Sequence, residues 1–226
     1  MRPVVVFVLL SLPASSVGAP DPKAAERADQ QKAVERVKEL GGHIYHDYQR
    51  VPTPKPNTFD PALRPEDPKA FHRVILVHLW DTKATDEDLK LIGKLPHLEI
   101  LDLTGTQVTS AGLAHLGKLK KLRVLSLMRT KVDDAGLAHV KRHADLWLLF
   151  LGKTAVTDAG LVHLKHLAKL EDWLDLSDTA VTDEGLKHLS GLKNLGALNL
   201  MRTKVTAEGK RKLKPFLPKT SIEIGR

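Results

Sequence analysis

The chain has 226 residues, of which 42% are hydrophobic and 27% charged, a composition typical of a folded protein rather than a disordered one. It contains no cysteine, which excludes disulfide bonds, thiolate metal sites and a cysteine nucleophile. The formal net charge of +8 favours anionic partners, but it does not distinguish nucleic acid, anionic lipid, acidic protein and cell-wall polymer.

Residues 1–19 have the pattern of a secretory signal peptide. One basic residue precedes an apolar run over 4–12, and small residues follow. Ala19 suits the last position before the cut, with Ser16 or Gly18 as alternative ends. Because the apolar run is too short to span a bilayer, we expect an exported protein, periplasmic or extracellular, with no membrane span after cleavage. An uncleaved N-terminal anchor is the alternative.

Residues 20–73 precede the repeats and are predicted to form an N-terminal cap. The polar segment 20–40 indicates a helix, and the glycine pair 41–42 is its stop signal. Residues 43–48, HIYHDY, alternate in polarity and predict a capping strand. Six prolines between 51 and 68 predict an extended loop.

From residue 74 to 226 one phrase recurs at intervals of 24 or 25 residues, in about six units followed by a C-terminal cap. Each unit begins with L-x-x-L-x-L, whose alternation predicts a short strand, and continues with T-D-x-G-L-x-H-L, whose leucines three residues apart predict a helix. We expect the threonine to cap the helix and the aspartate to favour the positive end of its dipole. The capping positions are Thr85, Thr109, Asp133, Thr157, Thr182 and Thr206.

The combined pattern, L-x-x-L-x-L-x-x-T-x-V-T-D-x-G-L-x-H-L, resembles a leucine-rich repeat of the variant found in exported planctomycete-type bacterial proteins. It is also similar to F-box-associated and ribonuclease-inhibitor-like repeats. The resemblance implies an α/β solenoid with a curved parallel sheet on the concave face, helices on the convex face and a non-catalytic role in protein binding. A threonine column replaces the usual asparagine or cysteine, and we expect its hydroxyls to bond backbone groups of adjacent turns. The column is Thr82, Thr106, Thr130, Thr154, Thr179 and Thr203.

Since the repeated residues set the shape, we expect function where the copies differ, at the outward strand positions. Large aromatic and aliphatic side chains near the middle of a concave sheet are typical of a binding hot spot, and charged neighbours could form its rim. The predicted partner-binding residues are Phe150, Trp173, Leu148, Met128, Trp80, Asp102, Asp175, Arg129 and Arg202. The alternative is that Trp147 and Trp173 pack internally over the sheet edge. The segment LEDWLDL, which has one extra residue, indicates a bulge or a longer loop before its strand.

Three further groups suggest chemistry without supporting it. His78, Asp102 and Ser126 share one strand position, but aspartate stands where a catalytic triad needs histidine, so an enzyme is the weakest alternative. Histidines recur once per helix, at His115, His139, His163 and His188, and are interpreted as boundary side chains that donate to carbonyls rather than as metal ligands. We expect no cofactor and no metal.

Basic residues gather towards the helix ends. One interpretation is that these residues form a solvated face, where their charge suits the negative end of each helix dipole. The alternative is that they bind an anionic polymer or surface. No aromatic residues interleave them for base stacking, so no specific nucleic-acid site is expected. They are Lys118, Lys120, Lys121, Lys141, Arg142, Lys165, Lys169, Lys210, Arg211, Lys212 and Lys214.

Overall fold

The computed structural model describes residues 22–46 and 73–225. The predicted signal peptide over 1–19, the last two residues of the predicted capping strand and the proline-rich loop over 51–68 lie outside the described residues.

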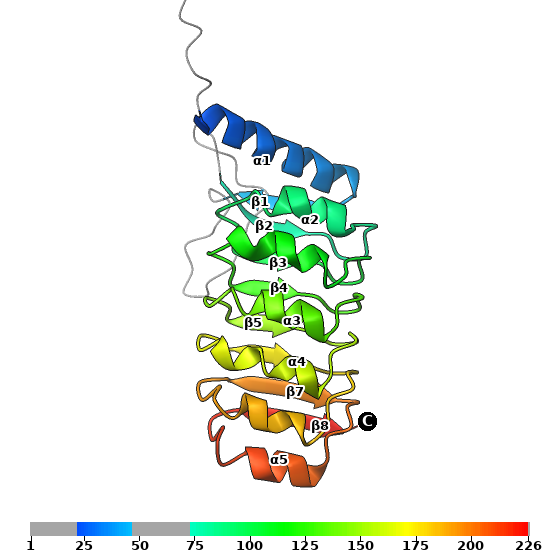
Figure 1. Cartoon of the computed structure of the whole chain (residues 1–226), viewed down its shortest axis with the longest axis vertical. Helices are drawn as coiled ribbons and strands as arrows, with labels where there is room; N and C mark the ends of the chain where they lie inside the picture. Colours follow the sequence, from blue (N-terminus) through cyan, green and yellow to red (C-terminus); the bar gives the residue numbers. More distant parts are fainter. Residues whose placement is uncertain (1–21, 47–72, 226) are drawn as a thin grey trace, which may run out of the picture.

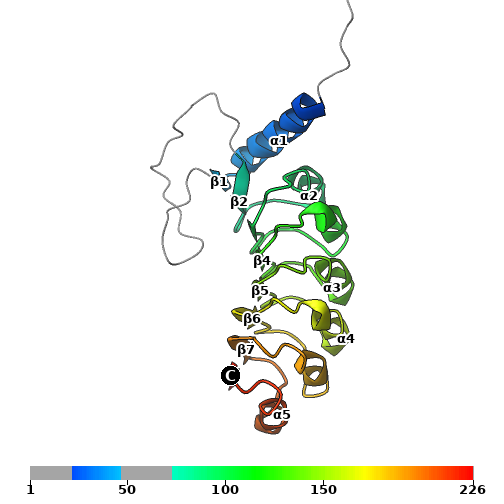
Figure 2. The same cartoon turned by 90° about the vertical axis from the view of Figure 1, so that its left-hand side faces the viewer.

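The described chain forms a stack of repeats in which strands line one side and helices the other (Figures 1 and 2). The strands are β1 (His43–His46), β2 (Val74–His78), β3 (Ile100–Asp102), β4 (Val124–Ser126), β5 (Leu148–Phe150), β6 (Trp173–Asp175), β7 (Ala197–Met201) and β8 (Ser221–Gly225). They make one sheet in chain order, in which β1 is antiparallel to β2 and every later pair is parallel. The helical segments are α1 (Pro22–Glu39), α2 (Asp86–Ile92), η2 (Gly112–Lys118), α3 (Asp134–Val140), α4 (Asp158–Leu161), η3 (Leu164–His166), η4 (Gly185–Leu189) and α5 (Ala207–Leu213).

Leucines of the repeated pattern fill the space between the two layers. The middle leucine of each strand, such as Leu125 or Leu149, is fully buried, and so are helix leucines such as Leu137 and Leu161. All of them belong to one continuous cluster that runs through every repeat. Because a single unit would leave its leucines exposed, the repeats gain stability only by stacking.

The helical segments are shorter and tighter than the repeat pattern predicts. Regular α-helix forms in α2, α3, α4 and α5, whereas η2, η3 and η4 are 3₁₀ turns. The prediction of one helix per unit is therefore right about position and wrong about form at η2 and η4. Length does not explain the difference, because η2, α2 and α3 each have seven residues.

The N-terminal cap closes the first repeat. Helix α1 ends before Gly41, which adopts the left-handed backbone conformation with φ +79°. Ala33 and Val37 of α1 are buried in the core cluster, and Arg36 donates to Asp88 of α2 at 2.7 Å. Strand β1 then adds an antiparallel strand to the sheet.

The threonine column makes a different bond from the expected one. Each hydroxyl donates to the carbonyl three residues earlier in its own turn, as Thr130 does to Leu127 at 2.6 Å. The same bond is present at Thr82, Thr106, Thr154, Thr179 and Thr203. The expected contact between these hydroxyls and adjacent turns is wrong, because the chain turns sharply where it leaves the strand and brings its own carbonyl within reach. These threonines hold each turn rather than join two turns.

The aspartate of the T-D-x-G-L phrase joins neighbouring repeats, a role that the helix-dipole interpretation missed. The carboxylate of Asp158 accepts bonds from Thr182, one repeat later, through the backbone N–H at 2.8 Å and through Oγ1 at 2.6 Å. Equivalent pairs join Asp86 to Thr109, Asp134 to Thr157 and Asp183 to Thr206. In the remaining repeat, Ser110 and Asp133 exchange the two bonds. We call each of these pairs a repeat lock.

The glycine of the phrase is explained by the same contact. A Cβ at Gly185 would overlap the carboxylate of Asp158 from the preceding repeat. The same close approach of a lock residue occurs at Gly112, Gly136, Gly160 and Gly209. The threonine, aspartate and glycine of the phrase T-D-x-G-L thus each have a role in the stack. The threonine donates to the aspartate of the preceding repeat, and the aspartate accepts from the threonine of the next repeat. The glycine leaves room for the carboxylate of the preceding repeat.

Candidate functional site

The strand register confirms the predicted alignment of outward residues in columns across the repeats. Leu76, Ile100, Val124, Leu148, Trp173 and Ala197 are paired in sequence across β2 to β7, and so are His78, Asp102, Ser126, Phe150, Asp175 and Asn199. The third column begins with Trp80, and backbone bonds such as Gly105 N–H to Met128 O continue the ladder beyond the strand ends. The extra residue of LEDWLDL is absorbed before β6, because Trp173 still pairs with Leu148. The outward face of this sheet is the concave face.

Four of the predicted residues form a contiguous apolar group, called here the central patch: Met128, Leu148, Phe150 and Trp173. Leu148 pairs directly with Trp173, while Phe150 lies beyond Leu148 on β5 and Met128 lies just beyond β4. Neighbouring parallel strands lie about 4.8 Å apart, which keeps all four within reach of one ligand surface. All four are half-buried, so part of each apolar side chain faces solvent.

Trp173 fits neither sequence interpretation fully, that is, neither full exposure at a binding surface nor internal packing over the sheet edge. The side chain is partly exposed, yet its Nε1 is buried and has no hydrogen-bond partner among the described residues. Trp147 is also half-buried, and the guanidinium of Arg123 lies over its ring, 4.7 Å from the centroid. This cation–π pair was missed, although the two residues stand 24 positions apart at equivalent places in adjacent repeats.

The charged residues form a less open rim than the prediction supposed. Asp175 is only 6% exposed and accepts the backbone N–H of Ser177 at 2.8 Å, so its place in the rim was a wrong prediction. Asp175 can be buried at an outward strand position because its carboxylate bonds to the backbone of its own chain. Arg202 donates to Asp178 at 2.6 Å and is thereby paired.

Trp80 lies apart from the central patch. Three strand spacings, about 14 Å, separate β2 from β5, which carries Leu148 and Phe150, and two spacings separate β2 from β4, beyond which Met128 lies. Trp80 is 64% exposed and, with His43, Tyr45 and His78, lines a hollow of about 400 Å³ at the N-terminal end of the concave face. Arg129 belongs to this end as well, because it is paired with Asp81 at 2.9 Å.

The polar residues of the concave face are not arranged as a triad. His78 Nδ1 lies 3.6 Å from Asp102 Oδ2, whereas the Ser126 hydroxyl is bonded to Thr104 at 2.6 Å. Thr104 also donates to Asp102 at 2.6 Å. Aspartate is therefore in the middle, as the register predicts, and no histidine of the described residues bonds the serine hydroxyl.

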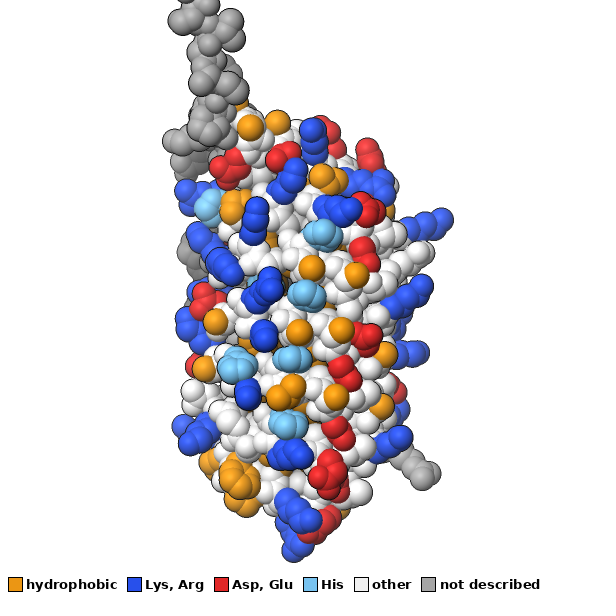
Figure 3. All heavy atoms as spheres, viewed as in Figure 1, with side chains coloured by type: hydrophobic (Ala, Val, Ile, Leu, Met, Phe, Trp, Pro, Cys, Tyr) orange, Lys and Arg blue, Asp and Glu red, His pale blue; other side chains and the backbone are white. Residues whose placement is uncertain are grey.

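The recurring histidines form a column on the helix face, with lysine and arginine side chains on both sides of it (Figure 3). Among the described residues, no group of three or more histidine and carboxylate side chains could hold a metal ion. Burial lowers the pKa of His163, and the positive charge of Lys141 lowers it further. The Nδ1 of His139 is buried without a partner, so that nitrogen makes no bond to a carbonyl.

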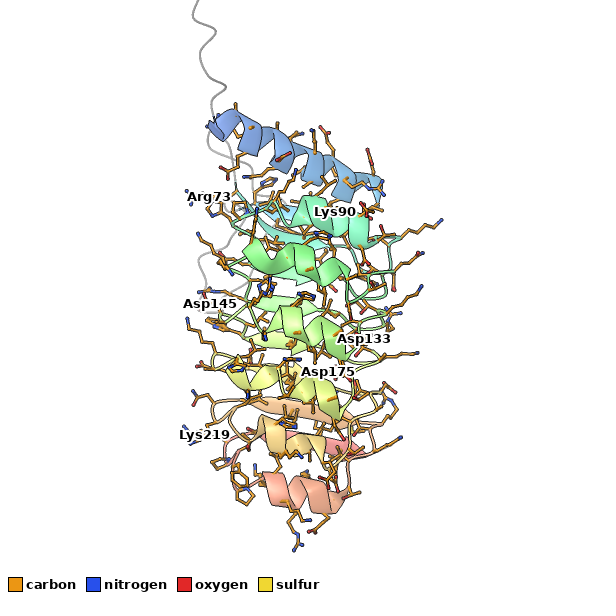
Figure 4. All side chains as sticks on the ribbon, viewed as in Figure 1. Arg73, Lys90, Asp133, Asp145, Asp175 and Lys219 are labelled. Carbon is orange, nitrogen blue, oxygen red and sulfur yellow. The ribbon has the colours of Figure 1, made fainter. Side chains whose placement is uncertain are left out.

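The basic residues of the helix face are only partly paired. Lys90 is bonded to Glu87, Lys94 to Asp29, and Lys169 to Asp145, the last at 2.6 Å (Figure 4 labels Lys90 and Asp145). Lys90, Lys94, His115, Lys118 and Arg142 line a hollow of about 440 Å³. Among the described residues, Lys118 and Arg142 have no ion-pair partner.

The comparisons agree with this architecture: the fold is a leucine-rich-repeat solenoid. Residues 94–117 and 174–190 match the family model described as Leucine Rich repeat. An internalin of Listeria monocytogenes is similar in structure, with a TM-score of 0.51 and 22% identity over 60% of this chain. The chain spans 36% of the length of that internalin, and at this identity the likeness concerns the fold alone.

Two further solved structures are more distant. Internalin C2 of the same species has a TM-score of 0.47 and 17% identity, over 67% of this chain and 80% of its own. A leucine-rich-repeat protein of Leptospira interrogans has a TM-score of 0.40 and 20% identity, over 59% of this chain and 45% of its own. No curated protein matches the sequence. None of the described helices is both long enough and apolar enough to cross a membrane.

Proposed function

We propose that the chain is a non-catalytic binding module that recognises a protein through the concave face. The observation that carries this proposal is the central patch of Met128, Leu148, Phe150 and Trp173, which is contiguous across three neighbouring strands and partly open to solvent. Leucine-rich-repeat domains commonly act as scaffolds for protein binding, which supports a role of this kind. The polar groups of the same face are bonded to one another without a triad, which does not support hydrolysis.

Aromatic side chains are well suited to this role because they bury a large area at a low cost in side-chain entropy. Phe150 and Trp173 are also held by a rigid sheet, so little ordering is left for the moment of binding. The paired charges around them, such as Arg202 with Asp178, would contribute more to specificity than to affinity.

The test compares the mature chain with a Phe150→Ala/Trp173→Ala variant in affinity capture from the envelope and medium of the source cell. Captured proteins would be identified by mass spectrometry and their affinities measured with purified material. Phe216→Ala is the matched control, because Phe216 is 58% exposed but lies in the C-terminal turn. Loss of two hot-spot side chains is expected to weaken binding by at least about 100-fold.

Circular dichroism must show that the double variant is folded. A partner that binds the folded double variant as tightly as the wild type would overturn the proposal. Loss of binding with Phe216→Ala instead would place the site at the C-terminal turn.

A second candidate function is the binding of an anionic polymer through the basic helix face. The unpaired cations Lys118 and Arg142 at one hollow favour it. Binding of this kind falls steeply with salt, whereas binding through the central patch does not. Capture that survives the Phe150→Ala/Trp173→Ala substitution, disappears at physiological salt and is lost with Lys118→Gln/Arg142→Gln would support this second function.

We further propose that the chain is exported and belongs to the planctomycete-type group of bacterial leucine-rich-repeat proteins. The signal-peptide pattern over 1–19 and the resemblance of the repeat phrase support this assignment. N-terminal sequencing of protein recovered from cell fractions tests the export. A chain that begins near residue 20 outside the cytoplasm is expected, and an intact N-terminus in the cytoplasm would contradict it.

A further inference from the structure

Trp80 is unusual because a large aromatic side chain stands in solvent at a fixed place. Tryptophan is mostly buried in folded proteins, yet Trp80 is 64% exposed. The equivalent positions of later repeats hold Thr104, Met128, Gly152, Ser177 and Met201, so the repeat pattern does not require an aromatic residue there.

A chain of charged hydrogen bonds holds the exposed ring in place. The indole Nε1–H of Trp80 donates to Asp81 Oδ2 at 2.7 Å. Asp81 in turn accepts two bonds from Arg129 Nη2, at 2.9 and 3.0 Å, from two repeats further along. Gly105 stands between them, and any Cβ there would overlap the Asp81 carboxylate. The ring is therefore pre-organised, which reduces the entropy lost when a ligand binds.

The ring borders a hollow built where the cap meets the first repeat. Strand β1 pairs antiparallel with β2, and this places His43 opposite His78 and Tyr45 opposite Leu76. Gly42 makes the close approach possible, since a Cβ there would lie 2.6 Å from the His78 carbonyl. The hollow of about 400 Å³ falls within the range of about 300–1,000 Å³ that is typical of small-molecule sites.

The chemistry of the lining selects the ligand. Because the indole N–H of Trp80 already donates to Asp81, Trp80 offers a ligand an apolar face and no hydrogen-bond donor. Neither Asp81 nor Asp102 lines the hollow, and both carboxylates already face a partner, Arg129 and His78, so they offer little attraction to an ionic ligand. Two imidazoles, His43 and His78, can donate and accept hydrogen bonds. A neutral, flat ligand with an apolar face and a polar periphery satisfies all of these conditions.

A hexopyranose whose substituents are equatorial has that form, because its axial C–H bonds make apolar faces and its hydroxyls lie at the edge. We propose that the hollow formed by His43, Tyr45, His78 and Trp80 is a saccharide-binding site that stacks a β-linked hexopyranose on the face of Trp80. The hollow uses none of the residues of the central patch, and the proposal does not rest on the protein-binding function proposed above.

The test uses cellohexaose and chitohexaose as probes, with binding to the mature full chain measured by isothermal titration calorimetry. Trp80→Ala is expected to weaken binding of at least one probe by about tenfold or more. Trp80→Phe, which keeps an aromatic face but lacks the N–H, is expected to retain part of the affinity. Arg129→Met, which removes the support of Asp81 without contacting the sugar, is expected to weaken binding less than Trp80→Ala does.

Phe216→Ala is the control for the loss of an exposed aromatic side chain, and it should leave sugar binding unchanged. Trp80→Ala should also leave capture through the central patch unchanged, which separates this site from the proposed protein-binding function. Failure of both probes to bind at millimolar concentration would overturn the proposal, as would equal affinity for the wild type and Trp80→Ala. Binding of a decaproline peptide in place of the sugars would also overturn it and assign the hollow to polyproline recognition.

Discussion

Replacing Asp158 by alanine should show how strongly the repeat locks hold the stack together. The variant loses two hydrogen bonds to Thr182, at 2.8 and 2.6 Å, and leaves a backbone N–H without its partner. Hydrogen bonds to charged groups contribute about 1.5–3 kcal/mol each, and the half-buried position of both residues favours the lower end. We expect a loss of about 2–3 kcal/mol in the free energy of unfolding.

Gly185→Ala tests the same lock from the opposite side. Its Cβ would overlap the Asp158 carboxylate, which must then move away and give up its bonds. The expected loss is about 3–6 kcal/mol, since overpacking costs about 1–3 kcal/mol in addition to the lost bonds, which contribute about 2–3 kcal/mol. Gly191→Ala is the matched control, because a Cβ at Gly191 meets no atom within 4 Å, and it should change stability by less than about 0.5 kcal/mol.

The double variant Asp158→Ala/Gly185→Ala separates this explanation from general damage to the repeat. Without the carboxylate, the new methyl group meets Leu161 Cδ1 at 3.0 Å, the end of a flexible side chain. The double variant should therefore lose only about 2–3 kcal/mol, well below the sum of the single effects. Urea unfolding followed by circular dichroism measures the wild type and all four variants. Single effects that add within about 0.5 kcal/mol would refute the lock as the reason for the glycine.

Three further predictions follow from other contacts. Gly105→Ala should destabilise the chain by about 1–3 kcal/mol, because φ is +70° there and a Cβ overlaps Asp81. Thermal unfolding measures this loss, and an unchanged unfolding midpoint would contradict the prediction. The Thr206 hydroxyl and backbone N–H lower the pKa of Asp183, so the stability from this pair is present above the unfolded pKa of about 3.9 and is lost as pH falls through the lower folded pKa. Urea titrations from pH 7 to pH 3 should show a shallower acid loss in Thr206→Val, and identical slopes would exclude the pair as a source. Arg202→Gln, which removes an exposed ion pair, should cost less than about 1 kcal/mol in the same urea assay, and a larger loss would mean that the pair is not solvent-screened.

Much of the fold could be predicted from the sequence because each repeat carries its own local signals. The alternation of leucines fixed the inward face of every strand, and the register of the outward columns followed from the spacing alone. The capping strand at residue 43 and the end of α1 before Gly41 were also predicted from local patterns. Such features depend on neighbours in the chain, which the sequence lists directly.

The candidate site was less accessible to sequence reasoning. The pattern grouped Trp80 with Phe150 because both are outward aromatic residues, but three strand spacings separate them. Asp175 has the position of a rim charge, and only its bond to the Ser177 N–H shows that it is buried. The periodicity of the repeat shows neither local bonds such as that of Asp175 to Ser177 nor contacts across repeats such as that of Arg129 to Asp81.

By itself, the sequence determined the repeat length, the strand register, the buried leucines and the absence of disulfide bonds. The tertiary structure alone decided that Asp158 bonds Thr182 of the next repeat and that Gly185 makes room for the carboxylate. It also decided that Arg129 reaches across Gly105 to hold Asp81 and thereby Trp80. The physical reason is stacking. Residues about 24 or 48 positions apart become neighbours only when the repeats lie against one another, so their contacts exist in the assembled solenoid and in no isolated unit.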